Sequence, residues 1–154
     1  MSVRVLVVHH TVSPAGDLLL EAVREGLSAE GLGEVSLDVR PALSTTPADL
    51  LAADGVVLLT PANIGYMSGA LKHFFDTVYY PCKDATDGLP YAAVVHGNQD
   101  LSGAVRSITA IASGMGWSPV AQIVEVVGAV EKGDREAVWD AAATVGASAA
   151  DSED

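Results

Sequence analysis

The chain has 154 residues, of which 49% are apolar and only 5% aromatic, so we expect one domain with a core of Val, Leu and Ala. Its formal charge of −12 argues against nucleic acid or anionic lipid as a partner, and is typical of a solubilising surface or of a protein with a basic redox partner. A single cysteine, Cys82, excludes an intrachain disulfide and a thiolate metal cluster.

Apolar runs alternate with amphipathic segments along the whole chain. Strands are predicted at residues 3–8, 34–39, 56–59, 91–96 and 120–127. Helices are predicted at residues 18–27, from Thr46-Pro47 onward, and at residues 70–79, 101–115 and 134–145. Such alternation implies right-handed crossovers and a parallel sheet, which places the chain in the doubly wound α/β class.

Residues 1–145 are expected to form this domain, and residues 146–154 are expected to be a flexible tail because they are small and acidic. The chain begins with a strand instead of a signal-peptide pattern, and its apolar runs are too short to cross a bilayer. We therefore expect a cytoplasmic protein without a membrane segment.

The segment at residues 60–72 is the most informative part of the chain. It follows a buried strand and precedes a helix, so it lies at the sheet edge where open α/β sheets bind their ligands. Its composition suits a flat, uncharged ligand. Seven consecutive residues are candidates to hold that ligand: Thr60, Pro61, Ala62, Asn63, Ile64, Gly65 and Tyr66.

This segment reads T-P-x-x-x-G-x-M-x-G-x-L, which resembles the flavin-ring loop of the flavodoxin-like superfamily. It is most similar to that of the NAD(P)H-dependent FMN reductases and the tryptophan-repressor-binding-protein-like quinone reductases. His9–Val12 and Thr60–Asp76 also resemble small actinobacterial proteins of the flavodoxin family. The resemblance implies a three-layer flavodoxin-like fold, with a five-stranded parallel sheet in the order 2-1-3-4-5 and FMN as cofactor.

A second loop joins the first strand to the first helix, where free amides and the helix dipole favour an anion. We expect it to hold the FMN phosphate through His10, Thr11, Ser13, Pro14 and Gly16, without lysine or arginine. It departs from the usual flavodoxin loop by containing Pro14 and ending in Asp17. If Asp17 caps the helix, its carboxylate competes with the phosphate, so we expect weaker FMN binding than in a standard flavodoxin.

A third loop, with His96, Gly97 and Asn98 as candidates, is expected to close the far side of the flavin ring. Asn98 or Asp100 could equally cap the following helix. His10 or His96 could tune the flavin potential or relay protons, or could simply be partly exposed loop histidines. The histidines lack a carboxylate at ligand spacing, so no metal site is expected.

The resemblance implies an FMN-binding oxidoreductase that passes electrons from NAD(P)H through FMN to a quinone or flavin acceptor. The flavin supplies the chemistry, so no catalytic side chain is expected. Two alternatives remain open: a non-enzymatic flavodoxin-type electron carrier, and a ligand-free flavodoxin-like scaffold. A homodimer or homotetramer is expected from the resemblance alone.

Overall fold

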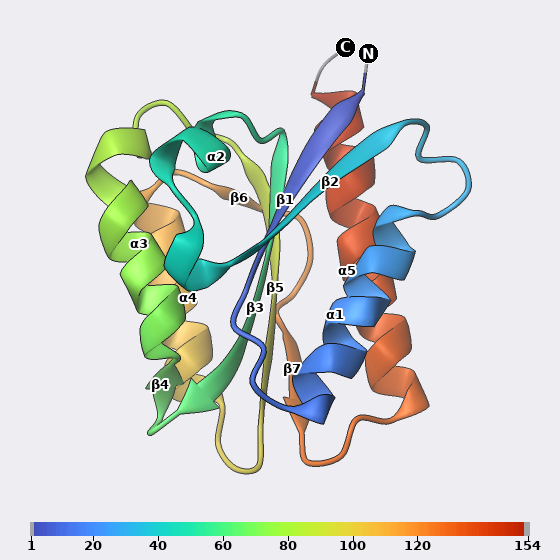
Figure 1. Ribbon diagram of the computed structural model, residues 1–154, viewed down its shortest axis with the longest axis vertical. Coiled ribbons are helices and arrows are strands. Elements are labelled where there is room, and N and C mark those ends of the chain that lie inside the picture. The colour runs from blue at the N-terminus through green and yellow to red at the C-terminus, as the bar shows by residue number, and fades with distance from the viewer. Residues whose placement is uncertain (1, 153–154) are drawn as a thin grey trace.

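The computed structural model describes residues 2–152 (Figure 1). The strands are β1 Val3–His9, β2 Val35–Pro41, β3 Gly55–Asn63, β4 Tyr66–Met67, β5 Pro90–Gly97, β6 Ser118–Pro119 and β7 Val124–Val127. The helices are α1 Pro14–Leu27, the 3-10 helix η1 Ala42–Ser44, α2 Pro47–Leu51, α3 Gly69–Cys82, α4 Ser102–Gly114 and α5 Lys132–Asp151.

The strands form one sheet in the order β2-β1-β3-β5-β6, with β7 pairing the outer half of β5. All these pairs are parallel, and only β4 runs antiparallel, against β3. The predicted order 2-1-3-4-5 is confirmed, because the fifth predicted strand corresponds to β6 and β7 together. That strand is divided where Val120 and Ala121, adjacent in sequence, both pack on the same side of the sheet, which a regular strand does not allow.

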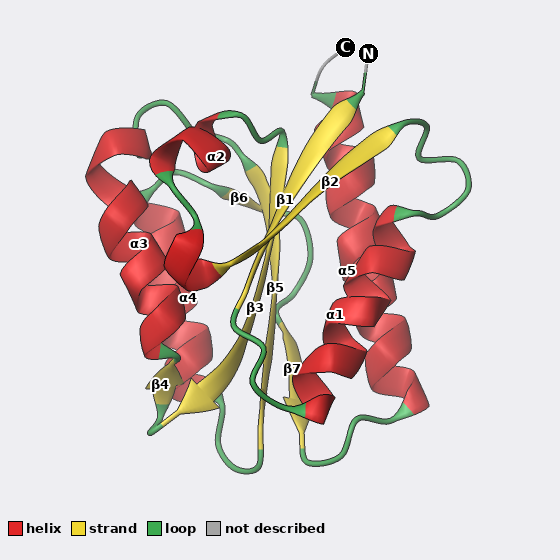
Figure 2. Ribbon diagram, in the orientation of Figure 1, coloured by secondary structure: helices red, strands yellow, loops and turns green. Residues whose placement is uncertain are grey.

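Helices cover both faces of the sheet, giving three layers (Figure 2). On one side α2, α3 and α4 enclose a core that includes Leu71, Phe74 and Phe75. On the other side α1 and α5 pack against a largely aliphatic core that includes Leu19 and Val138. Burial of these apolar side chains from both faces is the main source of stability.

The last helix extends beyond the predicted end of the domain. α5 continues to Asp151, with Val145, Gly146 and Ala149 buried. Small residues allow this close packing, since a β-carbon added to Gly146 would lie 3.1 Å from Leu32 Cδ1. The prediction of a flexible tail is therefore wrong through residue 151, and residues 153–154 of that prediction lie outside the described residues.

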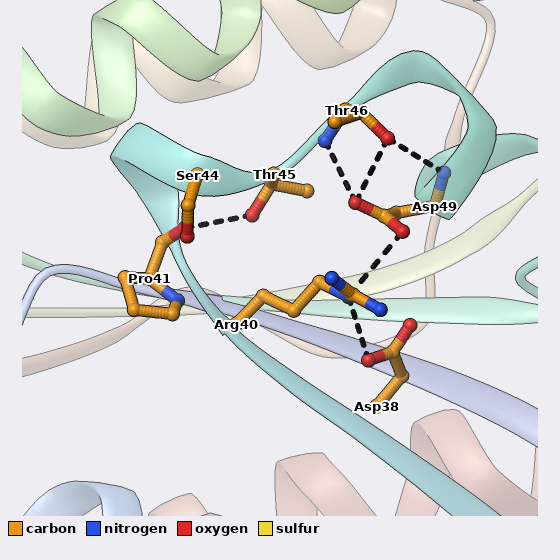
Figure 3. A network of polar contacts seen from close by, with 7 residues as sticks. All are labelled: Asp38, Arg40, Pro41, Ser44, Thr45, Thr46 and Asp49. Atoms are coloured by element: carbon orange, nitrogen blue, oxygen red, sulfur yellow. Dashed lines mark hydrogen bonds and ion pairs between the residues drawn. The ribbon is translucent and has the colours of Figure 1, made fainter.

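A polar network fixes the connection from β2 to α2 (Figure 3). Thr46 caps α2 as predicted, and Asp49 completes a capping box by accepting from the Thr46 amide at 2.8 Å. Asp49 also lies 3.4 Å from Nε of Arg40, which donates to Asp38 at 2.8 Å. The Thr45 hydroxyl donates to the Pro41 carbonyl at 2.8 Å. Side-chain hydrogen bonds therefore hold both η1 and the start of α2.

The loops that follow β1, β3 and β5 all emerge at one edge of the sheet, at the bottom in Figure 1. β1 begins and α5 ends at the opposite edge. None of the described helices is long and apolar enough to cross a membrane.

Candidate functional site

The loop from β1 to α1 presents a set of free amides. Ser13 is the N-cap of α1 and accepts from the Gly16 amide at 3.2 Å, while Pro14 occupies the first helical turn. Within residues 2–152, the amides of Thr11, Val12, Ser13 and Ala15 donate no hydrogen bond. Unpaired amides at the start of a 14-residue helix attract an anion through their dipoles.

Asp17 does not cap this helix, contrary to one of the readings of the sequence. Its amide donates to the Ser13 carbonyl at 3.1 Å, and its exposed side chain lies one turn into α1. Ser13 takes the cap because its extended backbone (φ −149°, ψ 161°) directs its hydroxyl at the Gly16 amide. Asp17 therefore leaves the loop amides free and opposes an anion by its charge alone.

The loop after β3 forms a tight hairpin with β4, which the sequence did not predict. Ala62 pairs with Met67 and Asn63 with Tyr66, leaving Ile64 and Gly65 as the two turn residues. Both have positive φ, 52° and 76°, as a primed hairpin turn requires. Gly65 is the usual residue for such a turn, but a β-branched residue at positive φ is strained. The side chain of Ile64 is fully exposed.

Thr60 anchors the base of the hairpin and is not free for a ligand. Its buried hydroxyl lies 2.8 Å from the Pro61 carbonyl and accepts from the Ser68 amide at 3.1 Å. The Ser68 hydroxyl in turn caps α3 by accepting from the Leu71 amide. Through these hydrogen bonds, Thr60 and Pro61 fix the base of the β3–β4 hairpin.

A cavity of about 470 Å³ separates this hairpin from the loop between β5 and α4. Five of the predicted residues line it: Ala62, Ile64, Gly65, Gly97 and Asn98. Its volume falls in the range of small-molecule sites. The remaining ring-loop candidates, Asn63 and Tyr66, lie on the hairpin outside the cavity lining.

Sequence reasoning missed four polar residues of this cavity: Gln99, Asp100, Ser102 and Arg106. The N-cap residue of α4 is Leu101, which makes no side-chain capping bond, so the prediction of Asn98 or Asp100 as the N-cap is wrong. Asp100 precedes the cap, and its Oδ1 accepts from the Ser102 amide at 2.9 Å. This hydrogen bond lowers the pKa of the Asp100 carboxyl, assisted by the Ser102 hydroxyl and the charge of Arg106. Ser102 and Arg106 are one helical turn apart and so lie on the same face of α4. From that spacing the sequence could have indicated that both residues face the same site.

The phosphate-loop candidates meet the third loop through His96. A β-carbon added to Gly16 would lie 3.1 Å from Thr11 Cγ2 and 3.7 Å from His96 Nε2. His96 is 7% exposed, so it is not a loop histidine but a buried residue of β5. On β1, which β3 separates from β5, His9 Nδ1 lies 2.9 Å from the Thr11 hydroxyl, and burial lowers the pKa of His9, with Arg24 and His10 adding to the effect.

Residues 15–131 match the family of NADPH-dependent FMN reductases, which is most of the chain. The chain belongs to this family. The match begins within the first turn of α1 and includes the β3–β4 hairpin and the β5–α4 loop. No curated protein matches the chain.

Solved flavodoxin-like structures share the whole fold of this FMN reductase family member. A flavodoxin, WrbA-like protein from Agrobacterium tumefaciens superimposes with a TM-score of 0.78 at 18% identity, over 97% of this chain and 98% of that one. An oxidoreductase from Corynebacterium diphtheriae gives 0.74 at 21% identity, over 97% and 98% of the two chains. A flavodoxin from the domain Archaea gives 0.81 at 15% identity, over 96% and 99%.

FMN has a dianionic phosphate and a flat ring system, and the site has matching features for both. The free amides at α1 suit the phosphate, and the hairpin and the β5–α4 loop enclose a cavity at the same edge of the sheet. The unpartnered Nε2 of His96 lies behind the same amides. The residues present therefore fit FMN.

Proposed function

We propose that this member of the family is an FMN-dependent oxidoreductase that passes electrons from NAD(P)H to a quinone or flavin acceptor. The observation that carries the proposal is the cavity between the β3–β4 hairpin and the β5–α4 loop, at the same edge of the sheet as a helix start with free amides. Bound FMN would supply the hydride and electron transfer. The protein supplies binding and orientation.

In this proposal the two ends of FMN are held by different elements. The amides of Thr11, Val12 and Ser13 hold the phosphate, with the dipole of α1 supporting its charge. Asn98 and the backbone around Gly97 border the ring, and Ile64 covers it with an exposed apolar side chain. Thr60 and Pro61 act indirectly by fixing the hairpin.

Arg106 places a cation in the cavity lining of a strongly acidic protein. Its charge lowers the pKa of Asp100, which lies in the same lining, so the two charges offset each other. The lining therefore repels the anionic substrate NAD(P)H less than the overall charge of −12 would. Ile64 in the cavity lining is fully exposed, so reductant and acceptor can approach the cavity from solvent in turn.

The test is to add FMN to purified protein, desalt it, and record the visible absorbance. Retained flavin bands that NADH or NADPH bleach without air, and that a short-chain quinone restores, are the expected result. Retained bands that no pyridine nucleotide bleaches would instead support the electron carrier. A protein that retains no FMN would support the ligand-free scaffold.

Two variants with the same change of charge sharpen this test. Val12→Glu places a carboxylate beside the free amides, and Leu43→Glu places one on η1, on another part of the surface. Both native residues are well exposed, at 69% and 63%. We expect Val12→Glu to weaken FMN binding roughly ten-fold or more through like-charge repulsion, and Leu43→Glu to leave it unchanged.

A further inference from the structure

His96 carries the one buried side-chain nitrogen or oxygen, among residues 2–152, that has no hydrogen-bond partner. The atom is Nε2 of the imidazole, and the residue is 7% exposed. Buried polar atoms in native proteins nearly always have a partner, so this one needs an explanation. A ligand that brings a partner is one such explanation.

The imidazole lies against the first turn of α1. Alternation along β5 directs Ala92, Val94 and His96 to the side of the sheet that α1 and α5 cover. Nε2 would lie 3.7 Å from a β-carbon at Gly16, which is van der Waals contact, so the imidazole nitrogen lies directly against this turn. The free amides of Thr11, Val12 and Ser13 belong to the same turn.

No charged neighbour compensates a proton on this ring. The titratable and charged groups on the surrounding elements include His9 on β1, His10 in the β1–α1 loop, Asp17, Glu21, Arg24 and Glu25 on α1, Glu125 on β7, Asp100 in the next loop, and Glu131, Lys132, Asp134 and Arg135 at the start of α5. Burial alone lowers the pKa of His96, and none of these groups contributes. The imidazole is therefore neutral at pH 7 until an anion comes near it.

We propose that His96 determines specificity for the phosphate end of the ligand, by taking a proton from solvent onto its imidazole when a phosphate binds at the α1 turn. The inference rests on the proposed function and adds a selection of FMN over riboflavin. The imidazolium and the phosphate attract one another across Gly16 in a region that excludes water, where charges interact strongly. Riboflavin lacks the phosphate and so leaves the ring neutral.

The first test compares wild type, His96→Gln and His73→Gln by calorimetry with FMN and with riboflavin. His73 is an exposed histidine on α3 and serves as the matched control. We expect His96→Gln to lower the ratio of FMN to riboflavin affinity roughly ten-fold, the factor of one pKa unit, and to leave riboflavin affinity unchanged. An unchanged ratio in His96→Gln would overturn the proposal.

Proton uptake on FMN binding distinguishes the proposed role of His96 from a merely structural one, because a structural histidine would not change it. Binding heats in buffers of different ionisation enthalpy report the protons taken up with each flavin. The phosphate of FMN itself titrates near about pH 6, so the quantity that matters is the difference between wild type and variant. Wild type should take up more protons than His96→Gln with FMN, and equally many with riboflavin; equal uptake with FMN would contradict the proposal.

A third measurement uses only the wild-type protein, in case His96→Gln does not fold. Nuclear magnetic resonance of the labelled imidazole nitrogens distinguishes neutral histidine from imidazolium. Inorganic phosphate and FMN should each convert His96 to imidazolium, whereas riboflavin should not. If phosphate protonates His96 but no flavin binds, the proposed function fails, and only the protonation of His96 by a phosphate stands. If FMN binds and His96 stays neutral, the inference fails and the function stands.

Discussion

The carbonyl oxygen of Gly65 lies where a side chain at Gly103 would begin: a β-carbon added to Gly103 would come within 1.8 Å of it. The tip of the β3–β4 hairpin therefore rests directly on the first turn of α4. Both residues line the candidate ring cavity, so this contact sets the separation of its two walls. Only glycine at position 103 permits that separation.

Gly103→Ala should displace the hairpin and weaken FMN binding. The added methyl group overlaps a backbone oxygen, and a backbone atom cannot swing away as a side chain can. We expect roughly ten-fold weaker FMN binding and a destabilisation of about 1–3 kcal/mol from overpacking. Fluorescence titration of FMN and urea denaturation measure the two effects.

Gly133→Ala is the matched control for this variant. Gly133 is the second residue of α5, as Gly103 is of α4, and a β-carbon at Gly133 meets no other atom within 4 Å. The control should bind FMN as wild type does and should be slightly more stable, because alanine favours helix over glycine. Equal FMN affinities for the two variants would show that the Gly65–Gly103 contact does not shape the cavity.

The fold could be predicted from the sequence because its signals are local. Apolar runs such as residues 56–59 mark buried strands, and the Thr46-Pro47 start of α2 follows from capping chemistry. The strand order came only from the resemblance, because it depends on pairing between distant segments. The extension of α5 was missed because Ala149 is buried by packing on the sheet, which composition does not reveal.

The loops that form the site could be predicted from the sequence, but the contacts between those loops could not. The three loops and five cavity residues were named in advance, since strand ends gather at one edge. The hairpin, the role of Gly103 and the inclusion of Arg106 depend on how α4 meets β3, and no local pattern encodes that. The capping function of Ser13 was missed because Asp17 is an equally good cap by composition.

Ile64→Asn should raise stability and lower FMN affinity together. Ile64 has a φ of 52°, which costs a β-branched residue about 1–2 kcal/mol, while Asn-Gly is a preferred pair for this turn. The native side chain gains nothing from packing in exchange, since it is fully exposed. A role of the Ile64 side chain in covering the ligand would explain why a strained apolar residue stands at this position.

Urea denaturation and FMN titration of Ile64→Asn distinguish this account from a neutral surface position. We expect a gain of about 1 kcal/mol in the free energy of unfolding without ligand. FMN should bind more weakly than to wild type. A variant that is more stable and binds FMN equally well would show that Ile64 does not contact the flavin.

Asp49→Ala should destabilise the protein more than the loss of an exposed ion pair does. Asp49 accepts from the amide and the hydroxyl of Thr46 at 2.8 and 2.9 Å and also lies beside Arg40 (Figure 3). Its side chain is only 15% exposed, so solvent screens these contacts weakly. Loss of the Asp49 half of the capping box together with the ion pair should cost about 1–2 kcal/mol.

Asp76→Ala is the comparison for that variant. Asp76 pairs with Lys72 on α3, but its side chain is 64% exposed. Solvent-exposed pairs of this spacing contribute only about 0.3–0.5 kcal/mol. Thermal unfolding should therefore show a clear decrease for Asp49→Ala and almost none for Asp76→Ala, and a reversed order would refute the importance of the network around α2.

Without ligand, the protein should lose stability as pH falls through the range in which histidine titrates. Burial lowers the folded-state pKa of both His9 and His96 from 6.5, and Arg24 and His10 lower that of His9 further. The unfolded chain therefore binds protons first as pH falls below 6.5, and this favours unfolding. The stability is present above pH 6.5 and is lost as pH falls toward the lower folded-state values.

Urea denaturation of wild type, His96→Gln and His73→Gln between about pH 8 and about pH 5 measures this loss. The 20 acidic side chains are common to all three proteins, so the differences between their slopes isolate each histidine. His96→Gln should flatten the loss on acidification and His73→Gln should not. Saturating FMN should reverse the contribution of His96, because a bound phosphate favours the protonated ring, so that acidification stabilises wild type relative to His96→Gln. A slope that FMN leaves unchanged would place the phosphate too far from His96 to interact with it.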